Sequence, residues 1–141
     1  MVEFRDTDMA GIMHFASFFD YMESAEHEMI RSLGFSVHAT IESGALNEDG
    51  VISFPRVRAS CDYVSPAQCE QVLDITVHVA KIGNKSVIYD FQFRHQDRLV
   101  AKGSMTCVCC LFQPGAMPVS RKLPKDIVEK LSRYAVSSQP P

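Results

Sequence analysis

The sequence of 141 residues predicts a single α+β domain in which one long helix lies across one face of a curved antiparallel sheet. Three observations lead to this prediction. Apolar residues recur at helical spacing from Phe15 to Leu33, and between Arg56 and Phe112 the pattern changes to alternation. Turn-forming residues separate the alternating segments, as they do between neighbouring antiparallel strands. Because the helix is strongly apolar along one side, it needs the inner face of such a sheet to cover it.

The N-terminal part of the chain contains the predicted helix and two connecting segments. Val2–Arg5 is long enough for a short edge strand at most. The helix ends before Gly34, a residue type that commonly follows the last helical turn. The turn-rich segment 36–50 is predicted as a loop with room for one short helical turn. The helix has an apolar face formed by Phe15, Phe18, Phe19, Met22, Ala25, Met29, Ile30 and Leu33.

Four strands are predicted in the second half of the chain, and we expect them to follow one another as a meander. Gly83-Asn84 predicts a tight hairpin turn between the second and third strands, and Gln96-Asp97-Arg98 predicts the next turn. Apolar residues occupy alternate positions in each strand. The predicted strands are 56–63, 73–80, 87–93 and 99–112.

The C-terminal part predicts one further element and a tail. Proline and glycine mark a loop between residues 114 and 124, and an amphipathic stretch follows it. We place the domain at residues 1–135 and expect residues 136–141 to form a flexible tail. The apolar side of the amphipathic stretch comprises Ile127, Val128, Leu131 and Tyr134.

The overall composition argues against several classes of protein. The chain carries a net charge of -3, whereas a general nucleic-acid binder needs a basic face to displace counterions from phosphate. No apolar run approaches the length of about 18 residues that spans a bilayer, and no leader-like segment opens the chain. We therefore expect a cytoplasmic protein that neither binds nucleic acid nor inserts into a membrane.

The cysteines are expected to be free thiols. Their number is odd, and three of them fall inside one apolar strand, which is typical of buried cysteines in a reducing compartment. No second pair of ligands lies at the spacing of a zinc finger, so no metal site is predicted. The five cysteines are Cys61, Cys69, Cys107, Cys109 and Cys110.

The stretch Asp6-Thr7-Asp8, followed by Gly11 and His14, places two acids one residue apart just before the helix. From the local pattern the acid pair has three interpretations: a hydrated turn that caps the helix, a metal site, or catalytic carboxylates. Magnesium sites that use such a pair follow a buried parallel strand in a much larger domain, which disfavours the second interpretation. Capping and catalysis remain open on the local pattern.

Several segments in addition to the acid pair occur in a characteristic order and spacing. They are Asp6-Thr7-Asp8, Ala10-Gly11-Ile12, Ala16, Phe18 and Glu23, then FPRVRASCDYVSPA at 54–67, GNKSV at 83–87 and VCCLF at 108–112. Together they resemble the 4-hydroxybenzoyl-CoA thioesterase family, which includes the acyl-CoA thioesterases of the Tol-Pal cluster. The resemblance implies a hotdog fold, in which a curved antiparallel sheet wraps around the long helix. It also implies a homodimer or homotetramer with active sites at the subunit interface.

The resemblance assigns catalytic roles to two positions. Asp8 matches the family's catalytic aspartate, acting as a nucleophile or a general base. The backbone N–H of Phe15 matches the donor that polarises the thioester carbonyl. Helix physics agrees with this second role, because the first amides of a helix lack intrahelical partners. Glu23 is the rival carboxylate, since other hotdog branches place their catalytic acid on the central helix.

The resemblance also implies substrate-binding positions. The segment from Asp62 to Ser65 is expected to reach the acyl site from the partner subunit, and Lys85 with Ser86 to contact the phosphates of coenzyme A. Arg121 and Lys122 are further phosphate candidates. The full set of substrate-binding residues comprises Gly11, His14, Tyr63, Val64, Ser65, Lys85 and Ser86.

The chain departs from the family pattern just before and within the helix. Many relatives have an aromatic residue followed by histidine where this chain has His14-Phe15, and asparagine and tyrosine where it has Ser17 and Phe18. No catalytic role is therefore carried over to a histidine side chain, and His14 is predicted to pack or cap. The differences also indicate a different acyl pocket.

The predicted function is that of an acyl-CoA thioesterase, which converts an acyl- or aroyl-CoA thioester and water into a carboxylic acid and free coenzyme A. No cofactor or metal is expected, because coenzyme A is part of the substrate. Two alternatives are a hotdog acyl-CoA hydratase or dehydratase and a non-catalytic acyl-CoA-binding protein. The sequence does not predict which acyl group is bound.

Overall fold

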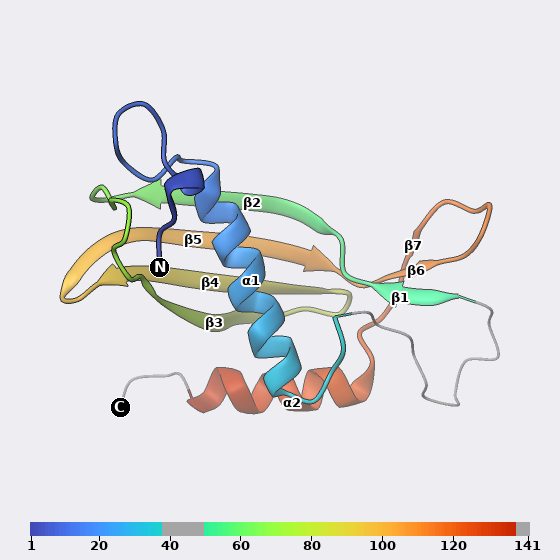
Figure 1. Ribbon diagram of the computed structural model, residues 1–141. Coiled ribbons are helices and arrows are strands. Elements are labelled where there is room, and N and C mark those ends of the chain that lie inside the picture. The colour runs from blue at the N-terminus through green and yellow to red at the C-terminus, as the bar shows by residue number, and fades with distance from the viewer. Residues whose placement is uncertain (38–49, 138–141) are drawn as a thin grey trace.

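The computed structural model describes residues 1–37 and 50–137, with side chains up to residue 135. Figure 1 shows the long helix α1 (Ser17–Ser32) lying across one face of a curved sheet, while a second helix, α2 (Lys125–Ser137), runs along the edge of the sheet formed by β3 (Asp74–Ile82). The predicted α+β class, with one helix across an antiparallel sheet, is confirmed.

Helix α1 buries one stripe of its surface against the sheet. The buried residues are Phe18, Met22, Glu26 and Met29, whose spacing of three and four places them on one side. The turn after α1 reaches Gly34 with a φ of +85°, a conformation that glycine adopts readily. Neither described helix has the length and apolarity that crossing a membrane requires.

The main sheet has four antiparallel strands in the order β2-β5-β4-β3. The prediction of a meander holds for β3, β4 and β5, but β2 pairs with β5, so that Tyr63 lies opposite Ala101. The predicted meander was wrong for β2. The alternation of apolar and polar residues indicates which residues form a strand, but the neighbour of that strand depends on the path of the connection after Tyr63. The remaining bounds are β2 (Arg56–Tyr63), β4 (Ser86–His95) and β5 (Arg98–Val108).

The predicted strand 99–112 is broken at Cys109, which places its last residues in a second sheet. Cys109 donates its N–H to the Lys85 carbonyl (2.7 Å), and its own carbonyl accepts the N–H of Arg121 (2.7 Å). These bonds replace the β5 ladder at this point, and the chain then leaves the main sheet. The second sheet has the order β1-β6-β7 and comprises β1 (Val51–Ser53), β6 (Cys110–Phe112) and β7 (Val119–Ser120).

The N-terminus and the connecting segments differ in part from the predictions. Phe4–Asp6 forms a single 3-10 turn, η1, in place of the predicted edge strand, although Val2 exchanges two 2.8 Å backbone bonds with Glu70 and Gln71. The loop predicted at 36–50 falls largely on residues 38–49, which lie outside the described residues. Helix α2 continues to Ser137, two residues into the predicted tail, and residues 138–141 are also outside the described part.

The packing between α1 and the sheet depends on a glycine. Gly103 on β5 is buried beneath α1, and a Cβ at this position would collide with the end of the Met22 side chain. Glycine therefore lets the helix approach the sheet closely. All five cysteines are free thiols, as predicted, and Cys107, Cys109 and Cys110 are buried.

Candidate active site

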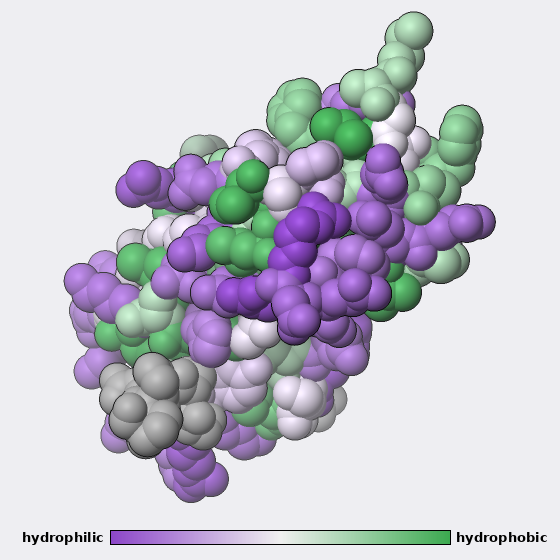
Figure 2. Space-filling view, turned by 90° about the vertical axis from the view of Figure 1, so that its left-hand side faces the viewer, coloured by the Kyte–Doolittle hydropathy of each residue, from purple (hydrophilic) through white to green (hydrophobic). Residues whose placement is uncertain are grey.

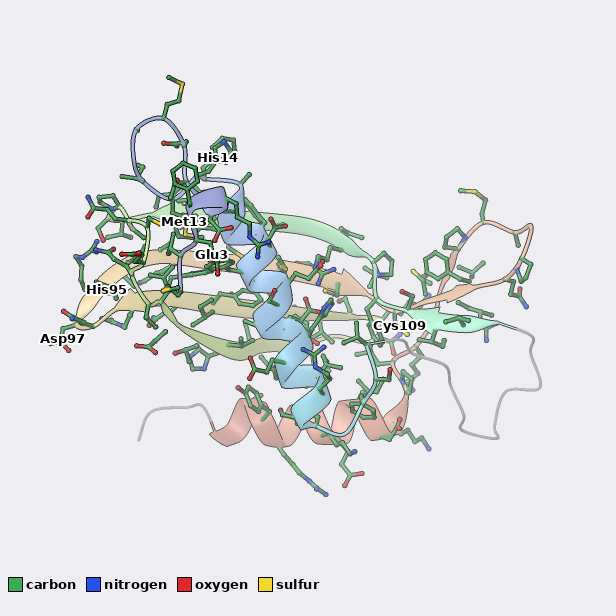
Figure 3. All side chains as sticks on the ribbon, in the orientation of Figure 1. Glu3, Met13, His14, His95, Asp97 and Cys109 are labelled. Atoms are coloured by element: carbon green, nitrogen blue, oxygen red, sulfur yellow. The ribbon has the colours of Figure 1, made fainter. Side chains whose placement is uncertain are left out.

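The segment between η1 and α1 forms a narrow loop that backbone hydrogen bonds hold together. His14 donates its N–H to the Asp6 carbonyl (2.7 Å), and Asp8 donates to the Ile12 carbonyl (3.0 Å). Met13 lies between these bonds and is buried, which anchors the loop to the core. Figure 3 shows Met13 and His14 beside the N-terminal end of α1. The loop therefore holds Asp8 in a defined position relative to the start of the helix.

Asp8 lies at the exposed tip of this loop. Its Oδ1 accepts the N–H of Ala10 (2.8 Å), and its carbonyl accepts the N–H of Gly11 (3.0 Å). Gly11 adopts a φ of +76°, so the tight return of the chain at this point favours glycine. Gly11 thus shapes the turn that presents Asp8. The Ala10 bond orients one carboxylate oxygen of this exposed side chain.

Three amides just before and at the start of α1 have acceptors within the chain. His14 N–H donates to Asp6, Ala16 N–H donates to His14 Nδ1 (3.1 Å), and Ser17 N–H donates to the His14 carbonyl (3.0 Å). Within residues 1–37 and 50–137, no acceptor takes the N–H of Phe15. This amide was expected in the first turn of the helix, but α1 begins at Ser17 with Ala16 as its N-cap, so the Phe15 N–H belongs to the turn just before the helix.

The His14 side chain acts as a cap. Because its Nδ1 accepts the Ala16 N–H, this nitrogen is not available as a base toward a ligand. The imidazole also stacks on the Phe15 ring, with 4.4 Å between ring centroids. This geometry agrees with the interpretation of His14 as a packing and capping residue.

Asp6 differs from Asp8 in its surroundings. Partial burial acts to raise the pKa of Asp6, but hydrogen bonds from the Tyr21 hydroxyl and the Glu3 N–H outweigh it, so that the pKa is lowered. A carboxylate with a lowered pKa is a weak base. Asp6 is therefore suited to hold the loop in place and poorly suited to accept a proton.

Tyr63, at the end of β2, contacts the helix start of its own chain. Its hydroxyl donates to the Phe15 carbonyl (2.8 Å), and its ring packs edge to face on Phe18, with 5.2 Å between centroids. Val64 is exposed, whereas Ser65 donates its hydroxyl to the Leu99 carbonyl (2.6 Å). Tyr63 and Phe15 therefore come together, and Ser65 is bound to the sheet.

Glu23 is exposed on α1 and ion-paired with Arg56 of β2. Arg56 lies 3.2 Å from a Glu23 carboxylate oxygen and 2.7 Å from one of Glu26. The Glu26 side chain is 8% exposed, whereas that of Glu23 is 52% exposed. Burial raises the pKa of Glu26, and Arg56 counters it only in part. The two glutamates thus share one arginine, which gives Glu23 a structural partner.

The predicted phosphate contacts lie at the opposite end of the main sheet. Lys85, in the β3–β4 turn, accepts a backbone bond from Cys109, and Cys109 in turn accepts one from Arg121. The exposed cations Lys85 and Lys122 therefore lie on neighbouring backbone segments. Ser86 closes the turn by accepting the N–H of Gly83 (2.8 Å). Figure 3 shows Cys109 far along the sheet from His14.

Three large apolar side chains near the Asp8 loop are exposed. Phe4, Met9 and Phe15 are 84%, 106% and 62% exposed. Figure 2 views the molecule from the end that carries this loop and shows hydrophobic side chains projecting at the top of a mixed surface.

Sequence reasoning missed two features of this region. Tyr21, one turn into α1, contacts the Asp6 carboxylate, and Arg56 joins β2 to two glutamates of α1. Both contacts join residues far apart along the chain, and local periodicity carries no signal for them. Among the described residues, no three His, Cys, Asp or Glu side chains gather as a metal-ligand set would.

Comparisons with known proteins place the chain among thioesterases. A family model described as thioesterase-like superfamily matches residues 2–131. A 1,4-dihydroxy-2-naphthoyl-CoA hydrolase from Synechococcus elongatus is 26% identical over 109 residues, covering 77% of this chain and 76% of that protein. The acyl-CoA thioester hydrolase YbgC from Escherichia coli O6:H1 is 24% identical over 132 residues, covering 94% and 92%.

Solved structures show the same fold. Gentisyl-coenzyme A thioesterase BH1999 aligns with a TM-score of 0.75 and 26% identity, covering 92% of this chain and 94% of that one. The 1,4-dihydroxy-2-naphthoyl-CoA thioesterase Slr0204 from Synechocystis aligns with a TM-score of 0.78 and 21% identity, covering 94% and 91%. The predicted hotdog fold is confirmed.

Proposed function

The chain belongs to the thioesterase-like superfamily, and we propose that it hydrolyses an acyl- or aroyl-CoA thioester with Asp8 as its reacting carboxylate. The N–H of Phe15 stabilises the charge that develops on the carbonyl oxygen. The products are a carboxylic acid and free coenzyme A. No protein-bound cofactor takes part, because coenzyme A enters as part of the substrate.

The observation that carries this proposal is the amide of Phe15. Three amides beside it have acceptors within the chain, whereas in the described part of the chain the Phe15 N–H has none. Preorganised donors aimed at a developing oxyanion are commonly the largest contribution to acyl-transfer catalysis. A thioester carbonyl placed against this N–H would meet a donor that is already oriented and does not need to reorganise during the reaction.

The reaction can follow two routes from this geometry. Asp8 can remove a proton from water, so that the hydroxide oxygen adds to the carbonyl carbon and the C=O electron pair moves to oxygen. Alternatively, an Asp8 oxygen adds directly and gives a transient anhydride, which water then opens. In both routes the tetrahedral species collapses and expels the coenzyme A thiolate, while the Phe15 N–H holds the oxyanion.

Thioester hydrolysis is tested by a thiol-release screen on the wild-type protein. Aromatic and aliphatic CoA thioesters of graded chain length are supplied, and free thiol is measured with time. We expect turnover of at least one class and no hydration of an enoyl-CoA thioester. Hydration without thiol release would establish the hydratase alternative. Saturable binding without either reaction would establish a non-catalytic acyl-CoA binder.

We further propose that the active site is shared between two chains of a homodimer. The outer edge of β2 is unpaired in the described chain, and its residues 57–60 are exposed. Asp8 lies near one end of β2 and Lys85 near the other. The eight residues of β2 span about 26 Å, so the two side chains of one chain lie far apart. Antiparallel pairing of β2 with a second copy would bring Lys85 of one chain beside Asp8 of the other.

Lys85→Ala is expected to weaken binding of the nucleotide part of coenzyme A alone. A charge-assisted contact to phosphate contributes enough that we expect KM for a CoA thioester to rise about 10- to 100-fold, with kcat unchanged. KM for the matching pantetheine thioester, which lacks the nucleotide phosphates, should stay the same. Steady-state kinetics with both substrates measure this. Arg133→Ala removes a cation from α2 and serves as the matched control.

Hybrid dimers show whether the two groups act across the interface. A dimer with Asp8→Asn in one chain and Lys85→Ala in the other has one intact site if each site combines Asp8 from one chain with Lys85 from the other. Its KM should then equal the wild-type KM, with about half the wild-type kcat. If both groups act within one chain, the active site left in the hybrid retains the high KM of Lys85→Ala.

A further inference from the structure

Two hydroxyl groups on the first turns of α1 converge on Asp6. Ser17 and Tyr21 are four residues apart and therefore lie on the same side of the helix. The Ser17 hydroxyl donates to the Asp6 carbonyl (3.1 Å), and the Tyr21 hydroxyl donates to Asp6 Oδ2 (2.5 Å). The helix thus holds both the main chain and the side chain of Asp6.

Asp6 is linked to both groups of the proposed reaction. It lies two residues before Asp8, at the base of the loop that carries the reacting carboxylate. Its carbonyl also accepts the N–H of His14, the residue that precedes Phe15. A shift of Asp6 would therefore move Asp8 and the Phe15 amide relative to each other.

The Tyr21 contact has the character of a strong hydrogen bond. Its acceptor is a carboxylate oxygen, which also accepts the N–H of Glu3 (2.9 Å). The Tyr21 hydroxyl lies 3.0 Å from the Met1 carbonyl as well, but it has one proton, and the shorter contact to the charged oxygen takes it. Burial and the neighbouring Asp6 raise the pKa of Tyr21, so the hydroxyl stays a donor.

We propose that Tyr21 is a positioning residue for thioester hydrolysis, because its hydroxyl holds Asp6 and thereby keeps Asp8 aligned with the N–H of Phe15. The proposal rests on the function proposed above. Tyr21 acts through Asp6 and does not itself touch the substrate. Its role should therefore appear in kcat and in the stability of the loop, and not in KM.

Tyr21→Phe keeps the ring and removes the hydroxyl, and we expect kcat to fall about 10- to 100-fold with KM within about twofold of wild type. Asp6→Asn retains a carbonyl oxygen that can accept the Tyr21 proton, but without the negative charge, so its kcat should fall less than that of Tyr21→Phe. Asp6→Ala should lose as much as Tyr21→Phe. The double variant Tyr21→Phe/Asp6→Ala should lose no more than Asp6→Ala alone, because both changes remove one contact.

Hydrogen exchange of the loop amides gives a readout that does not depend on activity. Tyr21→Phe should accelerate exchange at the N–H groups of Asp8 and His14, while Tyr134→Phe on α2, the control, should change neither exchange nor kcat. Unchanged exchange and kcat in Tyr21→Phe, a raised KM, or an Asp6→Asn variant as inactive as Asp8→Asn would each overturn the proposal. A wild-type protein that releases no thiol but shows accelerated exchange in Tyr21→Phe would refute the function and leave the contact intact.

Discussion

Asp8→Asn is expected to lower kcat for thioester hydrolysis by about 10²- to 10⁴-fold, the range for loss of a general base, with a larger loss if Asp8 is the nucleophile. Asparagine keeps an oxygen that can accept the Ala10 N–H, so the loop should retain its shape. Because Asp8 is exposed, the free energy of unfolding should change by no more than about 0.5 kcal/mol. Thiol-release kinetics and thermal unfolding measure the two effects.

Two matched carboxylate variants control for this experiment. Asp6→Asn removes the other acid of the pair. This variant should remain active, because Asp6 serves as a hydrogen-bond acceptor and asparagine keeps a carbonyl oxygen. Glu23→Gln tests the rival on α1, which should also remain active because Glu23 is paired with Arg56. An inactive Glu23→Gln together with an active Asp8→Asn would move the reacting carboxylate to the helix.

The helix and strands were predictable because their signals are local. The apolar spacing of α1 and the alternation of β3 and β4 follow from which side of each element faces the core. Strand pairing carries no such signal, which is why β2 was expected beside β3 and lies beside β5. The break at Cys109 was hidden for a related reason. Cys107, Cys109 and Cys110 are buried and Val108 is apolar, so hydropathy stays uniform where the hydrogen-bond partner changes.

The residues of the candidate site also differ in whether their signals are local along the chain. Asp8 and Phe15 could be proposed from the sequence because the motif before the helix is contiguous, although α1 begins at Ser17, after Phe15. Tyr21 could not be identified, because its hydroxyl meets Asp6 only after the chain folds back along α1. From the sequence, Tyr21 is one more residue near the apolar face of a helix.

Arg56→Met is expected to cause the largest loss of stability, about 3 kcal/mol near neutral pH, at the lower end of the range for breaking a buried ion pair. The lower end applies because the Arg56 side chain is 27% exposed, whereas Glu26 is 8% exposed. Methionine fills the space of the arginine stem but leaves the Glu26 carboxylate without its cation. Denaturant unfolding of wild type and variant measures the difference.

The pH dependence of this loss identifies Glu26 as its source. Burial already raises the folded-state pKa of Glu26 above its ordinary value of 4.5, and removing Arg56 deletes the main opposing cause, so the pKa rises further. A carboxyl with a raised folded-state pKa favours folding below its unfolded pKa, and this contribution is lost as pH rises through the folded pKa. Arg56→Met should therefore be less destabilising at about pH 5 than at about pH 8.

The titratable groups around Glu26 are the reason for a double-variant control. His27 is next to Glu26 on α1, while Cys107 on β5 and Tyr89 on β4 lie close to its carboxylate. Burial, and to a smaller extent the charge of Glu26, raises the pKa of the Cys107 thiol to about 12. Comparing Arg56→Met with Arg56→Met/Glu26→Gln cancels the other groups, because both variants retain them. The double variant should regain stability at high pH. An equal loss at both pH values in Arg56→Met would instead attribute the effect to packing of the arginine stem.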